Sequence, residues 1–308
     1  MNSFSSQPYQ QSSGIYTLMQ TIPLWEIYLL DQKKSHFTIK SFLGDIKLFA
    51  GYFSSDKTIA TISTSDISNF LDWLQNGRGI PCSPKSHARR ITTIKSFFRW
   101  LATNGRILVD PAESVLQRSV ISPLPIILTP QEDKKILQKA LEYRNLPKPD
   151  ARYFTLYRLL IATGIKKSEC LALHQNHIDL EKAKKAFLFV RYSQPGNRYK
   201  ERKINLPEDW IEGYKEYLEQ YHPVDLVFPW STRRLEYLLE ELGTETLISK
   251  HLSFDMCRWT SALMDWNTNM ESDAIRQKMG ISKIQWREVS SKLRQLANPN
   301  ENVSENHE

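Results

Sequence analysis

Cysteine is scarce in this chain. The three cysteines, Cys82, Cys170 and Cys257, are widely spaced and odd in number, which excludes a disulfide framework and matches no metal-ligand spacing. We expect reduced thiols that are buried or half-buried, as free cysteine usually is. His174 and His177 stand three residues apart with no further ligand near them, so we interpret them as a surface or capping pair rather than a metal site.

Long apolar runs are also missing. No stretch of 18 or more apolar residues occurs, so no membrane-spanning helix is expected. The polar start of the chain, MNSFSSQPYQQSSG, has neither the basic beginning nor the apolar core of a signal peptide. We therefore expect a cytoplasmic protein that has no membrane partner and needs no metal or small-molecule cofactor.

The net charge of the chain is positive and unevenly distributed along it. The chain has 308 residues, which suits two domains, and its formal net charge is +7. Residues 1–125 carry 13 Lys and Arg against 8 Asp and Glu, whereas residues 126–308 carry 28 against 26. A solvated lysine-rich surface would also be basic. A local concentration of positive charge, however, is typical of a nucleic-acid footprint.

Composition along the chain predicts its organisation. A Ser- and Gln-rich tail over 1–20 is followed by a first helical domain over 21–118. The segment 119–130 holds three prolines and no helical period, which predicts a linker. A second domain then covers 131–297, and residues 298–308 form a polar tail.

Helical periodicity dominates the first domain. Leu24, Tyr28 and Leu29 indicate one helix, and a second is expected to begin with Thr38 as its N-cap. Ser63 opens a third helix. Ser83-Pro84 begins a long helix that ends near Asn104-Gly105, and Asp110-Pro111 is expected to open a short last one.

The second domain is expected to be helical around a small β-sheet. Thr129-Pro130 predicts an N-cap for a helix over 131–144, and another helix follows over 152–163. Residues 186–192 and 202–206 form the predicted strands, joined by turn residues at 195–197. After Pro207 the pattern is helical again to about Leu296.

The long helix of the first domain has an unusual charge pattern. Residues 85–109 contain no Asp or Glu. At the helical spacing of about 100° per residue, Ile91, Ile94, Phe98 and Leu101 fall on one apolar face. A neighbouring face carries only positive charge, from Lys85, Arg89, Lys95, Arg99 and Arg106. Solvated helices usually carry charges of both signs, because opposite charges one turn apart attract. A face with positive charge alone therefore favours a partner that supplies negative charge, such as a phosphate backbone.

Several segments now resemble a known family. Residues 89–101, with Asn104-Gly105 and Asp110-Pro111-Ala112, resemble the end of the core-binding domain of tyrosine recombinases, the phage integrase family. Residues 162–173, Ala-Thr-Gly-Ile-Lys-Lys-Ser-Glu-Cys-Leu-Ala-Leu, are similar to the box around the family's first catalytic arginine. Lys200-Glu-Arg202, Leu206-Pro207 and Val227-Phe228-Pro229 follow in order, and Leu252-Ser-Phe-Asp-Met-Cys-Arg258 resembles its His-x-x-Arg box.

The resemblance implies a fold and a chemistry. It implies a mainly α protein with a small β-sheet, in which a SAM-like core-binding domain precedes a catalytic-like domain. Both domains would clamp double-stranded DNA, and copies could assemble on it. In this family a tyrosine attacks a DNA phosphodiester during recombination and integration. Two arginines neutralise the transition state through bidentate donors, while a lysine and a histidine assist proton transfer.

Most of these roles fail when they are carried over residue by residue. The first arginine falls on Lys166, and the histidine of the His-x-x-Arg box falls on Asp255, whose charge has the wrong sign. The second arginine survives as Arg258. The lysine falls near Asn197, although Arg198 and Lys200 are close, and the later His or Trp falls on Ile281, near Trp286.

The nucleophile is missing altogether. Its expected position is Val289 or Ser290, and no tyrosine follows Tyr237. Ser290 or Ser291 could replace it in principle, but an activated nucleophile needs its neighbours.

The sequence therefore predicts a DNA-binding protein of this fold that lacks strand cleavage and acts as an accessory or regulatory binder. Its DNA contacts would be the five basic residues of the long helix together with Lys166, Arg198, Lys200, Arg202 and Arg258. Two alternatives stay open: an active recombinase with a rearranged site, and a protein–protein module that kept the fold and lost DNA.

Overall fold

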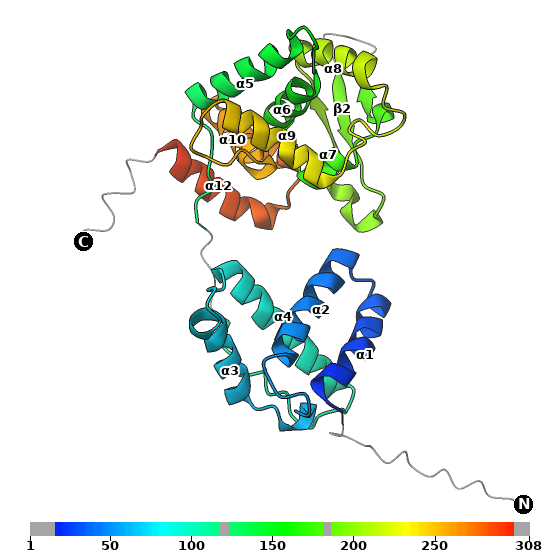
Figure 1. The fold of residues 1–308 in the computed structure, drawn as a ribbon, viewed down its shortest axis with the longest axis vertical. Helices are drawn as coiled ribbons and strands as arrows, with labels where there is room; N and C mark the ends of the chain where they lie inside the picture. Colours follow the sequence, from blue (N-terminus) through cyan, green and yellow to red (C-terminus); the bar gives the residue numbers. More distant parts are fainter. Residues whose placement is uncertain (1–15, 118–122, 181–185, 299–308) are drawn as a thin grey trace, which may run out of the picture. The chain divides into compact units, whose positions relative to one another are not determined.

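The computed structural model describes residues 16–117, 123–180 and 186–298 (Figure 1). Most of each predicted tail and part of the predicted linker lie outside these ranges. The chain divides into two compact units between residues 122 and 123. Each unit is helical, and the second contains a small sheet, which confirms the predicted fold class. No helix among the described residues is long and apolar enough to cross a membrane.

The described residues of the first unit form four α-helices around an aromatic core. Their bounds are α1 Leu18–Asp31, α2 His36–Ala50, α3 Thr64–Asp72 and α4 Pro84–Thr103. Short helical turns lie at Ile59–Thr61 and Trp73–Gly77. Trp25, Phe49 and Phe98 are completely buried and pack edge to face with neighbouring rings. The predicted apolar face of α4 is confirmed, since Ile91, Ile94, Phe98 and Leu101 all belong to this core.

Local capping explains where these helices begin. Ser63 and Asp66 form a reciprocal capping box at α3, and Ser83 caps α4 with Pro84 in the first turn, as predicted. The predicted cap at Thr38 is wrong. Ser35 caps α2 three residues earlier, and its side chain accepts a hydrogen bond from the Thr38 backbone N–H.

The short helix predicted after Asp110-Pro111 does not form. The Asp110 carboxylate accepts a bond from the Ala112 backbone N–H, which closes a turn there instead.

In the second unit, α6 lies at the centre. The helices are α5 Pro130–Arg144, α6 Arg152–Thr163, α7 Lys167–Leu171, α8 Glu208–Tyr221, α9 Thr232–Glu245, α10 Phe254–Asn267, α11 Ser272–Met279 and α12 Lys283–Ala297. Nine residues of α6 are buried, and the helix packs against α5, α8, α9 and α10. The predicted N-cap at Thr129 is confirmed, and Glu132 completes a capping box with it.

The sheet has one strand more than predicted. It is antiparallel in the order β1 Ile178–Asp179, β2 Phe187–Val190 and β3 Arg202–Asn205. Leu188 pairs with Ile204 in the register of β2 and β3. β1 has only two residues, too few for a period-2 pattern to appear in the sequence. A short 3-10 helix, η5 Pro195–Lys200, occupies the predicted turn between β2 and β3.

The cysteines and the histidine pair behave as expected. All three cysteines are free; Cys170 and Cys257 are buried and Cys82 is half-buried. His174 and His177 cap the short helix η3 Gln175–His177, and the His174 ring lies 2.8 Å from the Asp225 carboxylate.

Candidate nucleic-acid interface

The basic face of α4 is divided into two parts in the structure. Lys85 and Arg99 are exposed and Lys95 is half-buried, and none of the three forms an ion pair with any residue of the described ranges. The Lys95 ammonium donates only to the Glu113 carbonyl oxygen, at 3.1 Å. Lys95 and Arg99 line a hollow of about 620 Å³. The same hollow holds the hydrogen-bonding side chains of Thr92, Asn104 and Gln117.

Arg89 is held differently. Its Nη1 lies 2.7 Å from Oδ2 of Asp45, and it also donates to the Ser41 hydroxyl. Asp45 belongs to α2 and is buried. Burial raises the pKa of the Asp45 carboxyl, although Arg89 and Thr93 oppose the rise. The expectation of an acid-free surface therefore fails at Arg89, because the acid comes from a different helix.

Arg106 stands beyond the end of α4. Its guanidinium lies over the rings of Tyr16 and Trp100, at 5.6 and 5.7 Å from their centroids. Such stacking leaves a planar guanidinium edge able to donate. Arg106 is half-buried, as is Arg89, whereas Arg99 is exposed.

In the second unit, three of the predicted site cations meet at the end of α11. Arg202 donates to the Lys278 carbonyl at 2.6 Å, Arg258 to the Met279 carbonyl at 2.6 Å, and Lys166 to the Gly280 carbonyl at 2.9 Å. We call Lys166, Arg202 and Arg258 the cation cluster. The last carbonyls of a helix lack intrahelical partners and form the negative end of its dipole, so they stabilise nearby cations.

Glu169 holds the cation cluster together. It is 6% exposed, and its two oxygens accept from Nη1 and Nη2 of Arg202 at 3.0 and 2.8 Å. It also accepts from the Tyr192 hydroxyl and from the backbone N–H of Lys166. Glu169 is not among the site residues predicted from the sequence. Its position three residues after Lys166, at the third residue of a helix, was the available signal, because a carboxylate there forms a capping box.

The electrostatics of the cluster follow from burial and crowding. Burial lowers the pKa of Lys166 to about 8, and the positive charges of Arg258, Arg202 and Lys200 add to this against the opposing effect of Glu169. Burial also lowers the pKa of Arg258 to about 10. Lys200 lies on η5, where its ammonium bonds Asn197 at 2.8 Å and lies over the Tyr199 ring. Arg198, two residues earlier, is exposed.

Within the described residues, Asp255 and Arg258 form no ion pair or hydrogen bond, although they stand three residues apart on α10. Arg258 is buried and donates to the carbonyls of Gly164 and Met279. Asp255 is exposed in the first turn of α10, where a carboxylate interacts favourably with the positive end of the helix.

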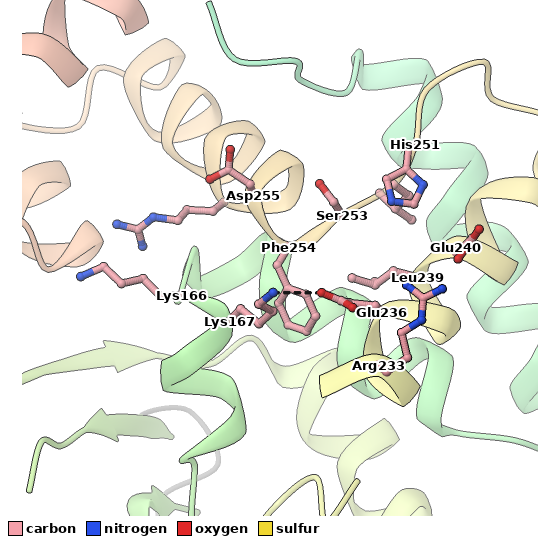
Figure 2. A pocket seen from close by; sticks show the side chains of 12 residues that line it. Lys166, Lys167, Arg233, Glu236, Leu239, Glu240, His251, Ser253, Phe254 and Asp255 are labelled. Atoms are coloured by element: carbon pink, nitrogen blue, oxygen red, sulfur yellow. Dashed lines mark hydrogen bonds and ion pairs between the residues drawn. The ribbon is translucent and has the colours of Figure 1, made fainter. Parts of the chain in front are cut away.

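Asp255 lines a hollow of about 590 Å³ with Lys166, Lys167, Arg233 and His251 (Figure 2). Lys167 there pairs with Glu236 at 2.9 Å.

The remaining predicted site positions, Ile281, Trp286 and Ser290, take part in packing or hydrogen bonds within the second unit. Ile281 is 9% exposed and packs in a small apolar core with Ile275 and Leu293. Trp286 packs against that core and donates to the Ser272 hydroxyl at 3.1 Å. Ser290 lies on α12, where its hydroxyl donates to the Arg287 carbonyl of the same helix. Within the described residues, no hydrogen bond joins Ser290 to the cation cluster.

Gly280 gives a direct test of this packing. Its φ is +58°, and a Cβ there would lie 2.5 Å from Nη1 of Arg202. We expect Gly280→Ala to lower the free energy of unfolding by about 1–3 kcal/mol, because a strained backbone and a displaced Arg202 combine. Urea unfolding measures this. The control is Gly196→Ala, where a Cβ meets nothing within 4 Å. Equal stability of the two variants would contradict the packing described.

Comparison with known proteins shows which proteins this chain resembles. Residues 22–105 match the model of the phage integrase N-terminal SAM-like domain. Tyrosine recombinase XerC of Roseiflexus castenholzii is 31% identical over 159 residues, which cover 50% of this chain and about half (49%) of that relative's length. Tyrosine recombinase XerC of Pediococcus pentosaceus is 24% identical over 284 residues, or 86% of this chain and 91% of the relative.

Solved structures agree on the fold. A lambda integrase tetramer bound to a Holliday junction superposes with a TM-score of 0.71 at 16% identity, covering 93% of this chain and 81% of that one. XerH recombinase bound to a palindromic difH substrate gives 0.69 at 17% identity, covering 95% and 85%. At such identities the likeness concerns the fold alone. Together with the sequence matches, the chain is similar to tyrosine recombinases over most of its length.

Proposed function

We propose that this protein binds double-stranded DNA and does not cleave it, and that it acts as an accessory or regulatory DNA binder. The observation that carries the proposal is the state of the cation cluster. Its donors are directed at the α11 carbonyls and Glu169, and no tyrosine follows Tyr237 in the sequence. The cytoplasm is the expected location.

The part of the α4 face that lacks ion-pair partners supports DNA binding. Lys85, Lys95 and Arg99 lack ion-pair partners in the described residues, so a phosphate backbone would supply the missing negative charge. The amide and hydroxyl groups beside Lys95 and Arg99 could contact base edges. The solved neighbours include integrases and recombinases bound to DNA, some as dimers or tetramers. Assembly of copies on DNA is therefore part of the proposal.

Three features support the absence of cleavage. Lysine at 166 offers a point charge where the family uses a planar two-pronged donor. Arg258 is buried, with its guanidinium on two backbone carbonyls. Asp255 would repel a phosphate rather than protonate its leaving oxygen. Lys166 and the exposed Arg198 and Lys167 could still hold a DNA phosphate without activating it.

The α4 contacts can be tested by salt dependence. We expect the triple variant Lys85→Ala, Lys95→Ala, Arg99→Ala to bind duplex DNA more weakly. Its slope of log affinity against log salt should be flatter by up to about three phosphate contacts, or roughly 0.9 per contact. Fluorescence anisotropy on a labelled duplex, between 50 and 200 mM salt, measures both.

The control removes the same charge elsewhere, with Lys134→Ala, Lys135→Ala, Lys148→Ala; these lysines are exposed in the second unit. A slope in the α4 variant that matches the wild type would contradict the proposed interface. Absence of binding in the wild type would favour the alternative of a protein–protein module. Cleavage of the duplex would favour the alternative of an active recombinase.

A further inference from the structure

Asp45 of α2 is a buried carboxylate, and its hydrogen bonds and ion pairs within the described residues are all with one stretch of α4. Oδ2 lies 2.7 Å from Nη1 of Arg89 and accepts from the Thr93 hydroxyl at 3.1 Å. Oδ1 lies 3.4 Å from Nε of Arg90. Asp45 itself is 4% exposed, so water screens these interactions poorly.

Arg89 and Arg90 differ from Arg99 in how much of the guanidinium remains available to a phosphate. The side chain of Arg90 is 14% exposed, and its Nη1 lies 2.7 Å from the Cys82 sulfur. The side chain of Arg89 is 38% exposed, but Nη1 is already shared between Ser41 and Asp45. A phosphate that reached Arg89 would have to compete with a desolvated carboxylate on the same side chain. At Arg99 no such competitor exists in the described residues.

We propose that Asp45 withholds Arg89 from DNA and so limits the strength of duplex binding by α4. This inference rests on the proposed function. Asp45 is then a positioning residue: it never touches DNA, but it decides which basic residues of α4 do. In the wild-type protein the phosphate contacts come from Lys85, Lys95 and Arg99. Removal of the Asp45 charge turns Arg89 outward and adds a contact.

The first test compares two single variants in the full chain. Arg99→Gln should weaken duplex binding and flatten the salt slope by about 0.9, so that its deficit relative to the wild type shrinks about threefold between 50 and 200 mM salt, as expected for one lost phosphate contact. Arg89→Gln removes the same charge while its amide can still bond Asp45 and Ser41. It should leave the affinity within about 1.5-fold and the slope unchanged, since the guanidinium makes no phosphate contact to lose.

The second test removes the competitor. Asp45→Asn should strengthen duplex binding and steepen the slope by about 0.9, so that its advantage over the wild type shrinks about threefold between 50 and 200 mM salt, and the added Arg89→Gln substitution should abolish this gain. Asp31→Asn is the charge-matched control, because Asp31 is exposed on α1. It should produce no change of slope. Circular dichroism establishes whether each variant is folded. If Asp45→Asn does not fold, the comparison of Arg89→Gln with Arg99→Gln still tests the proposal.

The outcomes separate the two proposals. An effect of Arg89→Gln as large as that of Arg99→Gln would overturn the withholding role. So would a folded Asp45→Asn variant that behaves like Asp31→Asn. In both cases DNA binding through α4 would still hold. If the wild type does not bind duplex, or Arg99→Gln has no effect, the proposed function itself fails.

Discussion

Replacing Glu169 with glutamine is expected to lower the free energy of unfolding by about 3–5 kcal/mol, the usual cost of removing one partner from a buried ion pair. Glutamine keeps the shape of the side chain but leaves the Arg202 guanidinium, 8% exposed, without its counter-charge. It also weakens the bonds from Tyr192 and from the Lys166 backbone. The loss should therefore exceed that expected for Gly280→Ala.

Urea unfolding followed by circular dichroism measures the change. Glu236→Gln is the matched control, because Glu236 pairs with Lys167 in an exposed position and such pairs contribute little. A Glu169→Gln variant as stable as Glu236→Gln would show that Glu169 does not hold the cation cluster together.

The same carboxylate makes stability depend on pH. Burial alone would raise the pKa of Glu169. The hydrogen bonds and charge of Arg202, with Tyr192 and the Lys166 N–H, outweigh that effect and lower the pKa to about 2, from 4.5. The folded state therefore binds this proton less readily than the unfolded chain. Its stabilising contribution is complete above about pH 4.5 and is lost as the pH falls towards about 2. The wild type should lose stability over this window more steeply than Glu169→Gln.

Much of the fold could be predicted from local signals. Capping at Ser63, Ser83 and Thr129 and the apolar face of α4 depend on residues close in sequence, and all are confirmed. The cap of α2 was misplaced because Ser35 and Thr38 are both good N-cap residues, and their spacing of three fits either one. The strand β1 was missed because two residues carry no periodicity.

The candidate site was harder to predict, because its interactions join distant segments. Position 166 was recognised from its motif, but nothing in that motif shows that the lysine donates to the carbonyl of Gly280, 114 residues later. Arg89 was assigned to the basic face from its helical angle. Asp45, which pairs with it, lies 44 residues earlier on another helix. Periodicity places a side chain on a face but does not show which element covers that face.

The absence of strand cleavage is the second large effect that we expect. Removing the nucleophile from a triad-like site costs about a millionfold in rate. Here the pair of bidentate arginines and the proton donor are changed as well. Val289→Tyr or Ser290→Tyr alone should not create activity. Arg258 would still donate to the α11 carbonyls, and Lys166 and Asp255 would be unchanged.

The serines of α12 are the remaining candidates for a nucleophile. The Ser290 hydroxyl donates to the carbonyl of Arg287. A serine needs an adjacent base to become reactive, and no described hydrogen bond gives Ser290 one. The double variant Ser290→Ala, Ser291→Ala should therefore behave like the wild type in every DNA assay.

The most direct test of binding without cleavage is a nicked suicide duplex built on a sequence that the protein selects from genomic fragments. A cleaving enzyme becomes trapped on such a substrate, because the short end next to the nick diffuses away and religation fails. A native gel reports binding, and a denaturing gel of the same sample reports covalent attachment. An active tyrosine recombinase on its own site serves as the positive control. We predict a shifted band on the native gel and no adduct on the denaturing gel. A covalent adduct that the wild type forms and the Ser290→Ala, Ser291→Ala variant does not would contradict the account.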